Sequence, residues 1–183
     1  MTGDVTVISG PTAVGKGTVV KALRARHPEV WVSVSATTRP PRPGEVDGEH
    51  YLFVSARGFD DLVASDGLLE WALVHGVDRY GTPAAPVQAA VAADRRVILE
   101  IDLQGARQVR EHLPEARLVF IAPPSQETLV KRLEGRGTET PEQMARRLRT
   151  AEGELAAAAE FDHVIVNDDL GSAVDELVEL LGL

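Results

Sequence analysis

Cysteine is missing from this sequence of 183 residues, and its absence excludes both a disulfide framework and any chemistry that needs a thiolate. Long apolar runs are missing too. The first one, residues 5–9, is short and has no basic flank, so we expect neither a signal peptide nor a transmembrane segment and place the protein in the cytoplasm. Acidic side chains outnumber basic ones, 28 to 19, and give the chain a formal net charge of −9. This negative charge argues against nucleic acid or an anionic membrane as a partner.

A glycine-bounded loop follows that first apolar run. It reads GPTAVGKGT over residues 10–18 and leads into a predicted helix over residues 19–26. A loop in this place points backbone N–H groups and the positive end of the helix dipole at one spot, and Lys16 adds a positive charge there. The pattern is typical of a phosphate-binding P-loop. A glycine-rich turn that merely contains a lysine is the weaker interpretation, because a strand precedes the loop and a helix follows it.

One position departs from the usual P-loop pattern. A serine or threonine normally follows the lysine and binds Mg²⁺, but here this residue is Gly17. Thr18 carries the nearest hydroxyl group. The sequence therefore leaves open how a metal ion would be held.

Apolar stretches of strand length alternate with helical stretches along most of the chain. Residues 97–101 are almost all apolar and precede Asp102, as in a strand buried inside a parallel sheet. We therefore predict one domain with an α/β fold, a P-loop NTPase-type central parallel sheet flanked by helices. Consecutive extended stretches predict an additional small β-rich lobe, and a strongly helical region predicts a lid. The predicted boundaries are about 1–32, 83–124 and 160–183 for the core, about 33–82 for the lobe and about 125–159 for the lid.

Arginine is gathered in two places in this acidic chain. Arg39 and Arg42 lie in a loop that is stiffened by prolines, and two guanidinium groups held in such a loop suit a phosphate monoester. The second group lies on both sides of a glycine-containing break between helical stretches, as a lid over polyphosphate requires. Considered alone, each group would better fit a solvated surface. The second group comprises Lys131, Arg132, Arg136, Arg146, Arg147 and Arg149.

Together these motifs resemble the guanylate kinase family, over the whole chain and in the family's order. GKGT occurs as a variant within that family, and Arg79 stands where many members have a second tyrosine before Tyr80. The resemblance implies transfer of the γ-phosphoryl group of ATP to GMP, and to dGMP, with Mg²⁺ as the cofactor, in purine nucleotide metabolism and GMP recycling. The stretches that carry it are SGPTAVGKGT, SVSATTRPPRPGEVDGEHYLFV, LLEWA, YGTP, ILEIDLQGA, FIAPPS, KRLEGRGTET, RRL and VIVNDDL.

The resemblance also implies a role for individual residues. Catalysis falls to Lys16, Arg39, Arg132, Arg136 and Arg147. The residues expected to bind ATP are Gly10, Pro11, Thr12, Ala13, Val14, Gly15, Lys16, Gly17, Thr18 and Asn167. The residues expected to bind GMP are Ser35, Arg39, Arg42, Glu45, Tyr51, Glu70, Tyr80, Thr82 and Asp102. Thr18 and Glu100 are the candidates for holding Mg²⁺, directly or through water.

The chemistry of this reaction fits such residues. The acceptor is a phosphate oxygen that is already largely ionised, because the second pKa of a monoester is about 6, so no general base is required. The barrier is the approach of two anions, and positioned positive charge lowers it. Guanine presents N1–H and an exocyclic amine, which the carboxylates of Glu70 and Asp102 would accept, whereas adenine presents an acceptor at N1 and is rejected.

Three other functions remain open on the sequence. A kinase of the same fold that acts on another phosphorylated small molecule, such as ribose 1,5-bisphosphate, would not need the guanine-reading residues. A non-catalytic protein-binding module would typically lose the P-loop glycines and lysine, and this chain keeps them. A P-loop enzyme acting on nucleic acid is opposed by the acidic charge. We expect a monomer or small homo-oligomer that binds ATP and GMP.

Overall fold

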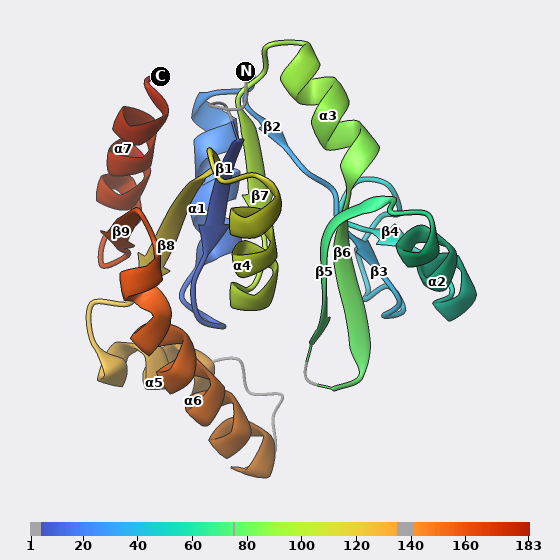
Figure 1. Ribbon diagram of the computed structural model, residues 1–183. Helices are drawn as coiled ribbons and strands as arrows, with labels where there is room; N and C mark the ends of the chain where they lie inside the picture. The colour runs from blue at the N-terminus through green and yellow to red at the C-terminus, as the bar shows by residue number, and fades with distance from the viewer. Residues whose placement is uncertain (1–4, 75, 135–140) are drawn as a thin grey trace.

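The structure is a computed structural model that describes residues 5–74, 76–134 and 141–183, apart from the side chains of residues 141–148. Figure 1 shows three parts: a core built on one sheet, a smaller lobe built on a second sheet, and two helices, α5 and α6, at one end of the core. Within the described residues, no helix is both long and apolar enough to cross a membrane.

A five-stranded parallel sheet forms the centre of the core, in the order β2-β7-β1-β8-β9. The inner strands are rich in valine, leucine and isoleucine because helices cover both faces of the sheet. The predicted α/β fold with a central parallel sheet is confirmed. The strands are β1 (Val5–Ser9), β2 (Trp31–Val32), β7 (Val97–Glu100), β8 (Arg117–Ala122) and β9 (His163–Val166).

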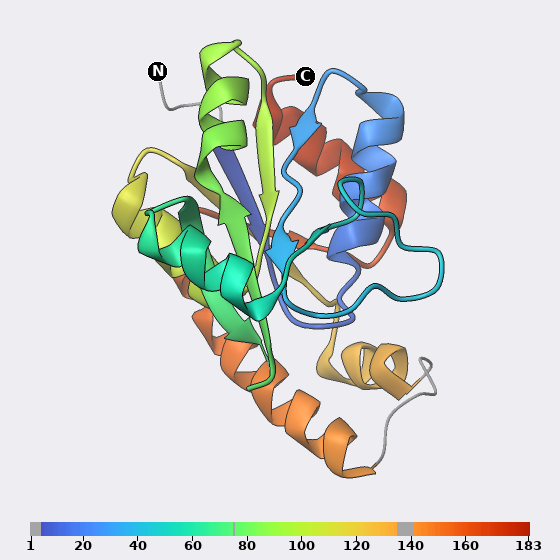
Figure 2. The same cartoon turned by 90° about the vertical axis from the view of Figure 1, so that its right-hand side faces the viewer.

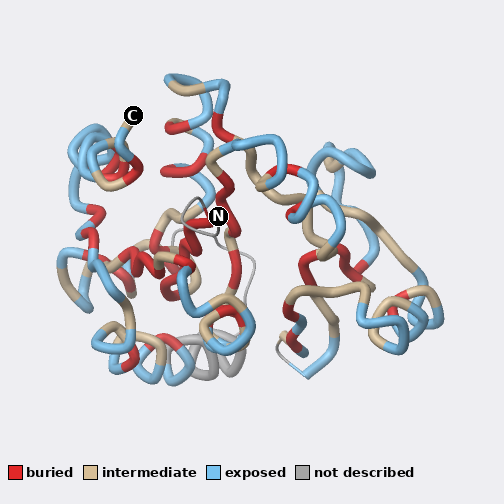
Figure 3. The backbone as a smooth tube through the Cα atoms, turned by 45° about the horizontal axis from the view of Figure 1, so that its top comes forward, coloured by how far each residue is buried: buried red, intermediate tan, exposed pale blue. Residues whose placement is uncertain are grey.

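Alternate residues of the strands point to opposite faces, and each face packs against its own helices. On β1, Val7 belongs to a core cluster that includes residues of α3 (Ala84–Ala92) and α4 (Leu103–His112). Its neighbour Ile8 belongs to a second cluster that includes residues of α1 (Lys16–Arg26), α5 (Gln126–Glu134) and α7 (Leu170–Leu181). Figure 3 shows the buried residues concentrated in the central sheet and on the inner sides of these helices.

The second sheet has four strands in the order β4-β3-β6-β5. β3 pairs with β4 in parallel and with β6 antiparallel, and β5 and β6 form an antiparallel hairpin. Helix α2 packs beside this sheet, as Figure 2 shows. The elements are β3 (Ala36–Thr37), β4 (Leu52–Phe53), α2 (Ala56–Ala64), β5 (Leu68–Val74) and β6 (Asp78–Pro83).

The carboxyl ends of the parallel strands determine where a ligand can bind. The P-loop follows β1, Asp102 follows β7, and Asn167 follows β9, so all three lie at the same edge of the sheet. The β5–β6 hairpin and α6 (Pro141–Ala156) lie beyond this edge, from opposite sides (Figures 1 and 2). A 3₁₀ turn, residues Ala157–Glu160, connects α6 to the last strand.

Candidate active site

The loop between β1 and α1 has a conformation that requires glycine at two positions. Gly10 and Gly15 have φ angles of 144° and 99°, which side chains of L-residues disfavour. A Cβ atom at Gly10 would lie 2.3 Å from the carbonyl oxygen of Ile121. A Cβ atom at Gly15 would lie 2.6 Å from Nδ2 of Asn167. Gly15 is the N-cap of α1, so the helix begins directly from the loop with its N–H groups facing it.

Asn167 and Arg132 tie this loop to the elements around it. Asn167 is buried and donates a hydrogen bond of 2.8 Å from Nδ2 to the carbonyl oxygen of Val14. Arg132 of α5 donates to two carbonyl oxygens, that of Val14 at 3.2 Å and that of Asn167 at 3.0 Å. We expected both side chains to face ATP. Both do reach the P-loop, and here they bond its backbone, which joins the loop to α5 and to the end of β9.

Lys16, the first residue of α1, reaches back over the loop. Its Nζ atom donates a hydrogen bond to the carbonyl oxygen of Gly10 and lies 3.4 Å from that of Pro11. Burial raises the pKa of Glu100, at the end of β7, and the charge of Lys16 lowers it by less than that. The ammonium group therefore lies between the phosphate loop and the carboxyl end of β7.

A cavity of about 290 Å³ lies between the core, the small lobe and α6. Thr12 and Lys16 of the P-loop line it together with Tyr80 of the lobe. The predicted donor and acceptor sites thus share one space. Five more of the residues predicted from the sequence line it: Ser35, Tyr51, Glu70, Glu100 and Asp102.

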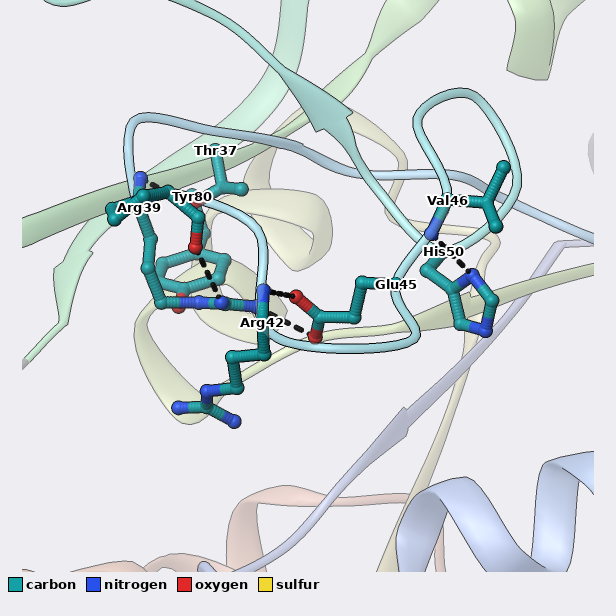
Figure 4. A network of polar contacts seen from close by, with 8 residues as sticks. Thr37, Arg39, Arg42, Glu45, Val46, His50 and Tyr80 are labelled. Carbon is teal, nitrogen blue, oxygen red and sulfur yellow. Dashed lines mark hydrogen bonds and ion pairs between the residues drawn. The ribbon is translucent and has the colours of Figure 1, made fainter.

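Arg39 is the centre of a hydrogen-bonded network in the proline-containing loop (Figure 4). It is 8% exposed, and it donates from Nε to the hydroxyl of Tyr80 at 3.0 Å and from NH2 to Oε1 of Glu45 at 2.9 Å. NH1 donates to the carbonyl oxygen of Pro40 at 2.8 Å. The guanidinium carbon lies 5.4 Å from the ring centre of Tyr51, a cation–π distance. Among the described residues these bonds use three of its five N–H groups and leave the other two without a partner.

Glu45 contacts both arginines of this loop. Besides Arg39, it accepts a hydrogen bond of 2.7 Å from the backbone N–H of Arg42 through Oε2. The bonds to Arg39 and Arg42 keep the pKa of Glu45 below its ordinary value, and the same ion pair raises the pKa of Arg39. The side chain of Arg42 is exposed and points away from Glu45 (Figure 4). Arg39 is thus held rigidly while Arg42 extends outward.

Glu70 is a buried carboxyl group, 4% exposed, on β5. Its Oε1 accepts a hydrogen bond of 2.6 Å from the hydroxyl of Thr82. Burial, and to a lesser degree the charge of Asp102, raises the pKa of Glu70 to about 7, although the bond from Thr82 acts in the opposite direction. Thr82 is fully buried behind this carboxyl group. Its contact is therefore with Glu70 rather than with the cavity itself.

The region around Gly17 bears on the metal ion. A Cβ atom at Gly17 would lie 3.4 Å from Oε1 of Glu100, and both residues border a second hollow of about 610 Å³ together with the exposed Thr18. Within the described residues, no group of three or more histidine, cysteine or acidic side chains could hold a metal ion. A single carboxylate beside a phosphate loop does match Mg²⁺, which binds through one or two carboxylates, water and substrate phosphates.

The structure adds one acidic residue that we did not predict from the sequence. Glu154 of α6 lines the cavity, and its Oε2 is buried with no hydrogen-bond partner among the described residues. Burial raises its pKa, while Lys16 and the backbone N–H of Thr12 lower it by less. In the sequence Glu154 is one of several glutamates in a helical stretch, and no motif distinguishes it. Three residues of the predicted lid group lie outside the described part of the chain: Arg136 and the side chains of Arg146 and Arg147.

Comparison with known proteins places the chain in a family. The guanylate kinase family model matches residues 2–182. A guanylate kinase from Cutibacterium acnes is 64% identical, over 100% of this chain and 92% of that protein, and one from Nocardia farcinica is 60% identical, over 97% and 93%. The crystal structure of guanylate kinase from Anaplasma phagocytophilum matches with a TM-score of 0.81 at 31% identity, over 98% of this chain and 85% of that one. A P-loop, a buried carboxyl group on β5 and a match along nearly the whole length lead to one conclusion: this chain belongs to the guanylate kinase family.

Proposed function

We propose that the cavity between the P-loop and Glu70 is where this enzyme transfers the γ-phosphoryl group of ATP to GMP, giving ADP and GDP. The family match over residues 2–182 supplies the reaction. The observation that carries the location is that Lys16 and Glu70 line the same cavity. A phosphate-binding loop therefore faces a carboxyl group suited to guanine across a single space.

The acceptor side is the lobe. Arg39, with two N–H groups left after its bonds within the protein, would bind the phosphate of GMP, and the exposed Arg42 would add a second guanidinium group. Tyr51 and Tyr80 complete this phosphate site with their hydroxyl groups. Glu45 takes no part in binding phosphate but positions both arginines.

The guanine base would lie between β5 and the start of α4. Glu70 and Asp102 both line the cavity there, and their carboxylates would accept the N1–H and 2-amino donors of guanine. Ser35 would meet another polar atom of the base edge, and Thr82 would orient Glu70 through their 2.6 Å hydrogen bond. Adenine would leave these carboxylates facing an acceptor, which disfavours its binding. We extend the proposal to dGMP.

The donor side is the P-loop. Its backbone N–H groups and Lys16 would hold the phosphates of ATP, while Arg132, Arg136 and Arg147 would add positive charge from the lid. Asn167 would border the nucleotide through its contact with the loop. Mg²⁺, bound to ATP, would be held by Glu100 and Thr18, directly or through water, and would neutralise charge on the phosphates. Because the acceptor oxygen is already ionised, no side chain has to remove a proton.

An ADP-release assay tests the reaction. The protein is given ATP, Mg²⁺ and one acceptor at a time, with GMP, AMP, CMP, UMP and ribose 1,5-bisphosphate compared at equal concentration. We expect GMP to react with a kcat/KM at least about 10⁴-fold above the other nucleotides. Comparable rates with AMP, or turnover of the sugar phosphate alone, would contradict the proposed substrate. The cytoplasmic location and the oligomeric state remain predictions.

Substituting Lys16 tests the location of the site. We expect Lys16→Met to lower kcat by about 10² to 10³, because one positively charged group at the transferred phosphoryl is lost. The melting temperature and the Kd for GMP should stay close to those of the unmodified protein, since Lys16 is only partly buried and its hydrogen bonds to Gly10 and Pro11 lie within the loop. A folded Lys16→Met protein with near-normal turnover would show that the phosphate loop is not the donor site.

A further inference from the structure

One face of α4 contacts β5. Asp102 is the N-cap of this helix, and Gly105, Gln108 and His112 follow at intervals of three, three and four residues, the spacing of side chains on one face of a helix. The helix packs on the parallel sheet of the core, whereas β5 is the edge strand of the second sheet. This face therefore joins the two parts of the protein that contribute to the predicted guanine site.

The side-chain amide of Gln108 bonds both polar atoms of the Trp71 backbone. Its Oε1 accepts from the N–H of Trp71 at 3.1 Å, and its Nε2 donates to the carbonyl oxygen of Trp71 at 2.7 Å. The opposite residue of a neighbouring antiparallel strand would make the same pair of bonds with its own N–H and C=O. Gln108 therefore takes the place of a further strand at the open edge of β5 and fixes that edge to α4.

Another hydrogen bond between α4 and β5 lies on the other side of Glu70, at Leu69. The pairing between β5 and β6 changes register between Leu68 and Glu70, an irregularity of the kind that re-aims a side chain next to a functional site. The carbonyl oxygen of Leu69, within this irregularity, lies 3.1 Å from Nδ1 of His112 and accepts its hydrogen bond. The residues immediately before and after Glu70 are thus both bonded to α4.

The carboxyl group of Glu70 also fits closely against the helix. A Cβ atom at Gly105 would lie 2.4 Å from Oε2 of Glu70, so only glycine leaves room for the carboxyl group in this position. The backbone N–H of Gly105 donates to Oδ1 of Asp102 at 2.8 Å. The same turn of α4 therefore places the Asp102 carboxylate and the space occupied by Glu70 next to each other.

We propose that Gln108 is a positioning residue for guanine recognition and that His112 assists it. By holding β5 against α4, Gln108 keeps the Glu70 carboxyl group near Asp102, where both line the same cavity. The inference rests on the proposed function. Gln108 touches neither phosphate site, so its loss acts on the choice of base and leaves the binding of ATP unchanged.

The test compares Gln108→Met with Gln88→Met. Methionine keeps the length of the side chain and removes both hydrogen bonds, and Gln88 is an exposed glutamine of α3 that serves as the matched control. The readout is the ratio of kcat/KM for GMP to that for IMP, whose base lacks the 2-amino group. We expect Gln108→Met to lower this ratio about five- to tenfold through the KM for GMP, with the KM for ATP within about twofold. Gln88→Met should change neither.

A binding measurement separates recognition from turnover. The chain has two tryptophans, so a Trp31→Phe background leaves Trp71, next to Glu70, as the fluorescent reporter of GMP binding. In this background the Kd for GMP should rise about five- to tenfold in Gln108→Met. His112→Leu should raise it by a smaller factor, and this variant replaces Gln108→Met as the test if Gln108→Met does not fold. A GMP/IMP ratio that stays unchanged in the folded variants, whether or not the melting temperature falls, would overturn the inference. Failure of the unmodified protein to phosphorylate GMP would instead reject the proposed function.

Discussion

Glu70 is a buried carboxyl group whose charge changes near neutral pH. Its pKa of about 7 means that it is about half protonated at pH 7 in the absence of ligand. The donors of guanine need an acceptor, and only the ionised carboxyl group offers all its lone pairs. Binding of GMP therefore favours the charged form and releases a proton from Glu70 below pH 7, where the group is mostly protonated.

We expect the Kd for GMP to fall as the pH is raised toward 7, by up to about tenfold per pH unit, and to level off above it. Titration calorimetry between pH 5.5 and 8.5 measures this. The GMP phosphate itself ionises near pH 6 and also changes the Kd for GMP. Glu70→Gln is therefore the control: its Kd should still change near pH 6 but no longer near pH 7. Identical profiles for the two proteins would show that Glu70 does not titrate with binding.

The two arginines of the acceptor loop differ in burial, and this separates their effects. Arg39 is buried in bonds to Tyr80, Glu45 and the loop backbone, whereas the side chain of Arg42 is exposed. We expect Arg42→Ala to raise the KM for GMP at least about tenfold with no change in melting temperature, since it loses only a ligand contact.

Arg39→Ala should raise the KM for GMP and also destabilise the fold by about 1–3 kcal/mol, because Glu45 and Tyr80 lose a buried partner. In both variants the KM for ATP should change far less than the KM for GMP. Arg57→Ala, an exposed arginine of α2 in the same lobe, is the control for nonspecific loss of charge. Equal effects on the two substrates would move this loop to the donor side.

At the level of elements, the strands with an apolar signal were predictable and β6 was not. The strand at Val5–Ser9 and the long apolar stretch after residue 96 have the composition of buried parallel strands, and both belong to the central sheet. β6 was not identified, because Gly81 and Pro83 disfavour an extended strand. It forms because it pairs with β3 on one side and β5 on the other, contacts that no local pattern reveals.

The residues of the candidate site likewise divide into those that a local sequence pattern predicts and those that it does not. The residues that we propose to bind phosphate could be selected from the sequence because the P-loop and the arginine loop are local patterns. Glu154 and Gln108 were not, because their roles depend on neighbours more than 30 residues away in the chain, the P-loop for Glu154 and Trp71 for Gln108. A surface helix presents many such polar side chains, and only the packing of α6 and α4 distinguishes these two.

Helix α6 brings a carboxyl group close to the expected phosphates of ATP. Glu154 lines the cavity next to Thr12 and Lys16, so its carboxylate competes with phosphate for the same positive charge. We expect Glu154→Gln to lower the KM for ATP about three- to tenfold by removing this repulsion, with a smaller effect on GMP. Glu152→Gln, on the exposed side of the same helix, is the control. An unchanged or raised KM for ATP in Glu154→Gln would contradict this competition.

For the whole molecule, the arrangement of charge predicts a change of shape on binding. The cavity of about 290 Å³ is at the lower limit of ligand pockets, about 300–1,000 Å³, yet two nucleotides have to meet beside it. The positive charges of Lys16 in the core and Arg39 in the lobe would converge on their phosphates. Glu45 offsets part of the charge of Arg39. The positive charge that remains repels Lys16 without ligand, whereas both phosphates, once bound, attract the two parts toward each other.

We therefore expect an open protein that closes around both nucleotides and excludes water from the transferred phosphoryl group. Small-angle X-ray scattering measures this with an analogue that joins adenosine and guanosine through a chain of phosphates. The radius of gyration should fall toward the value of about 16 Å for a compact chain of this length. A mixture of adenosine and guanosine, which carries no phosphate, should leave it unchanged, and high salt should shrink the ligand-free form by screening the repulsion. A radius of gyration that does not respond to saturating analogue would contradict closure driven by phosphate charge.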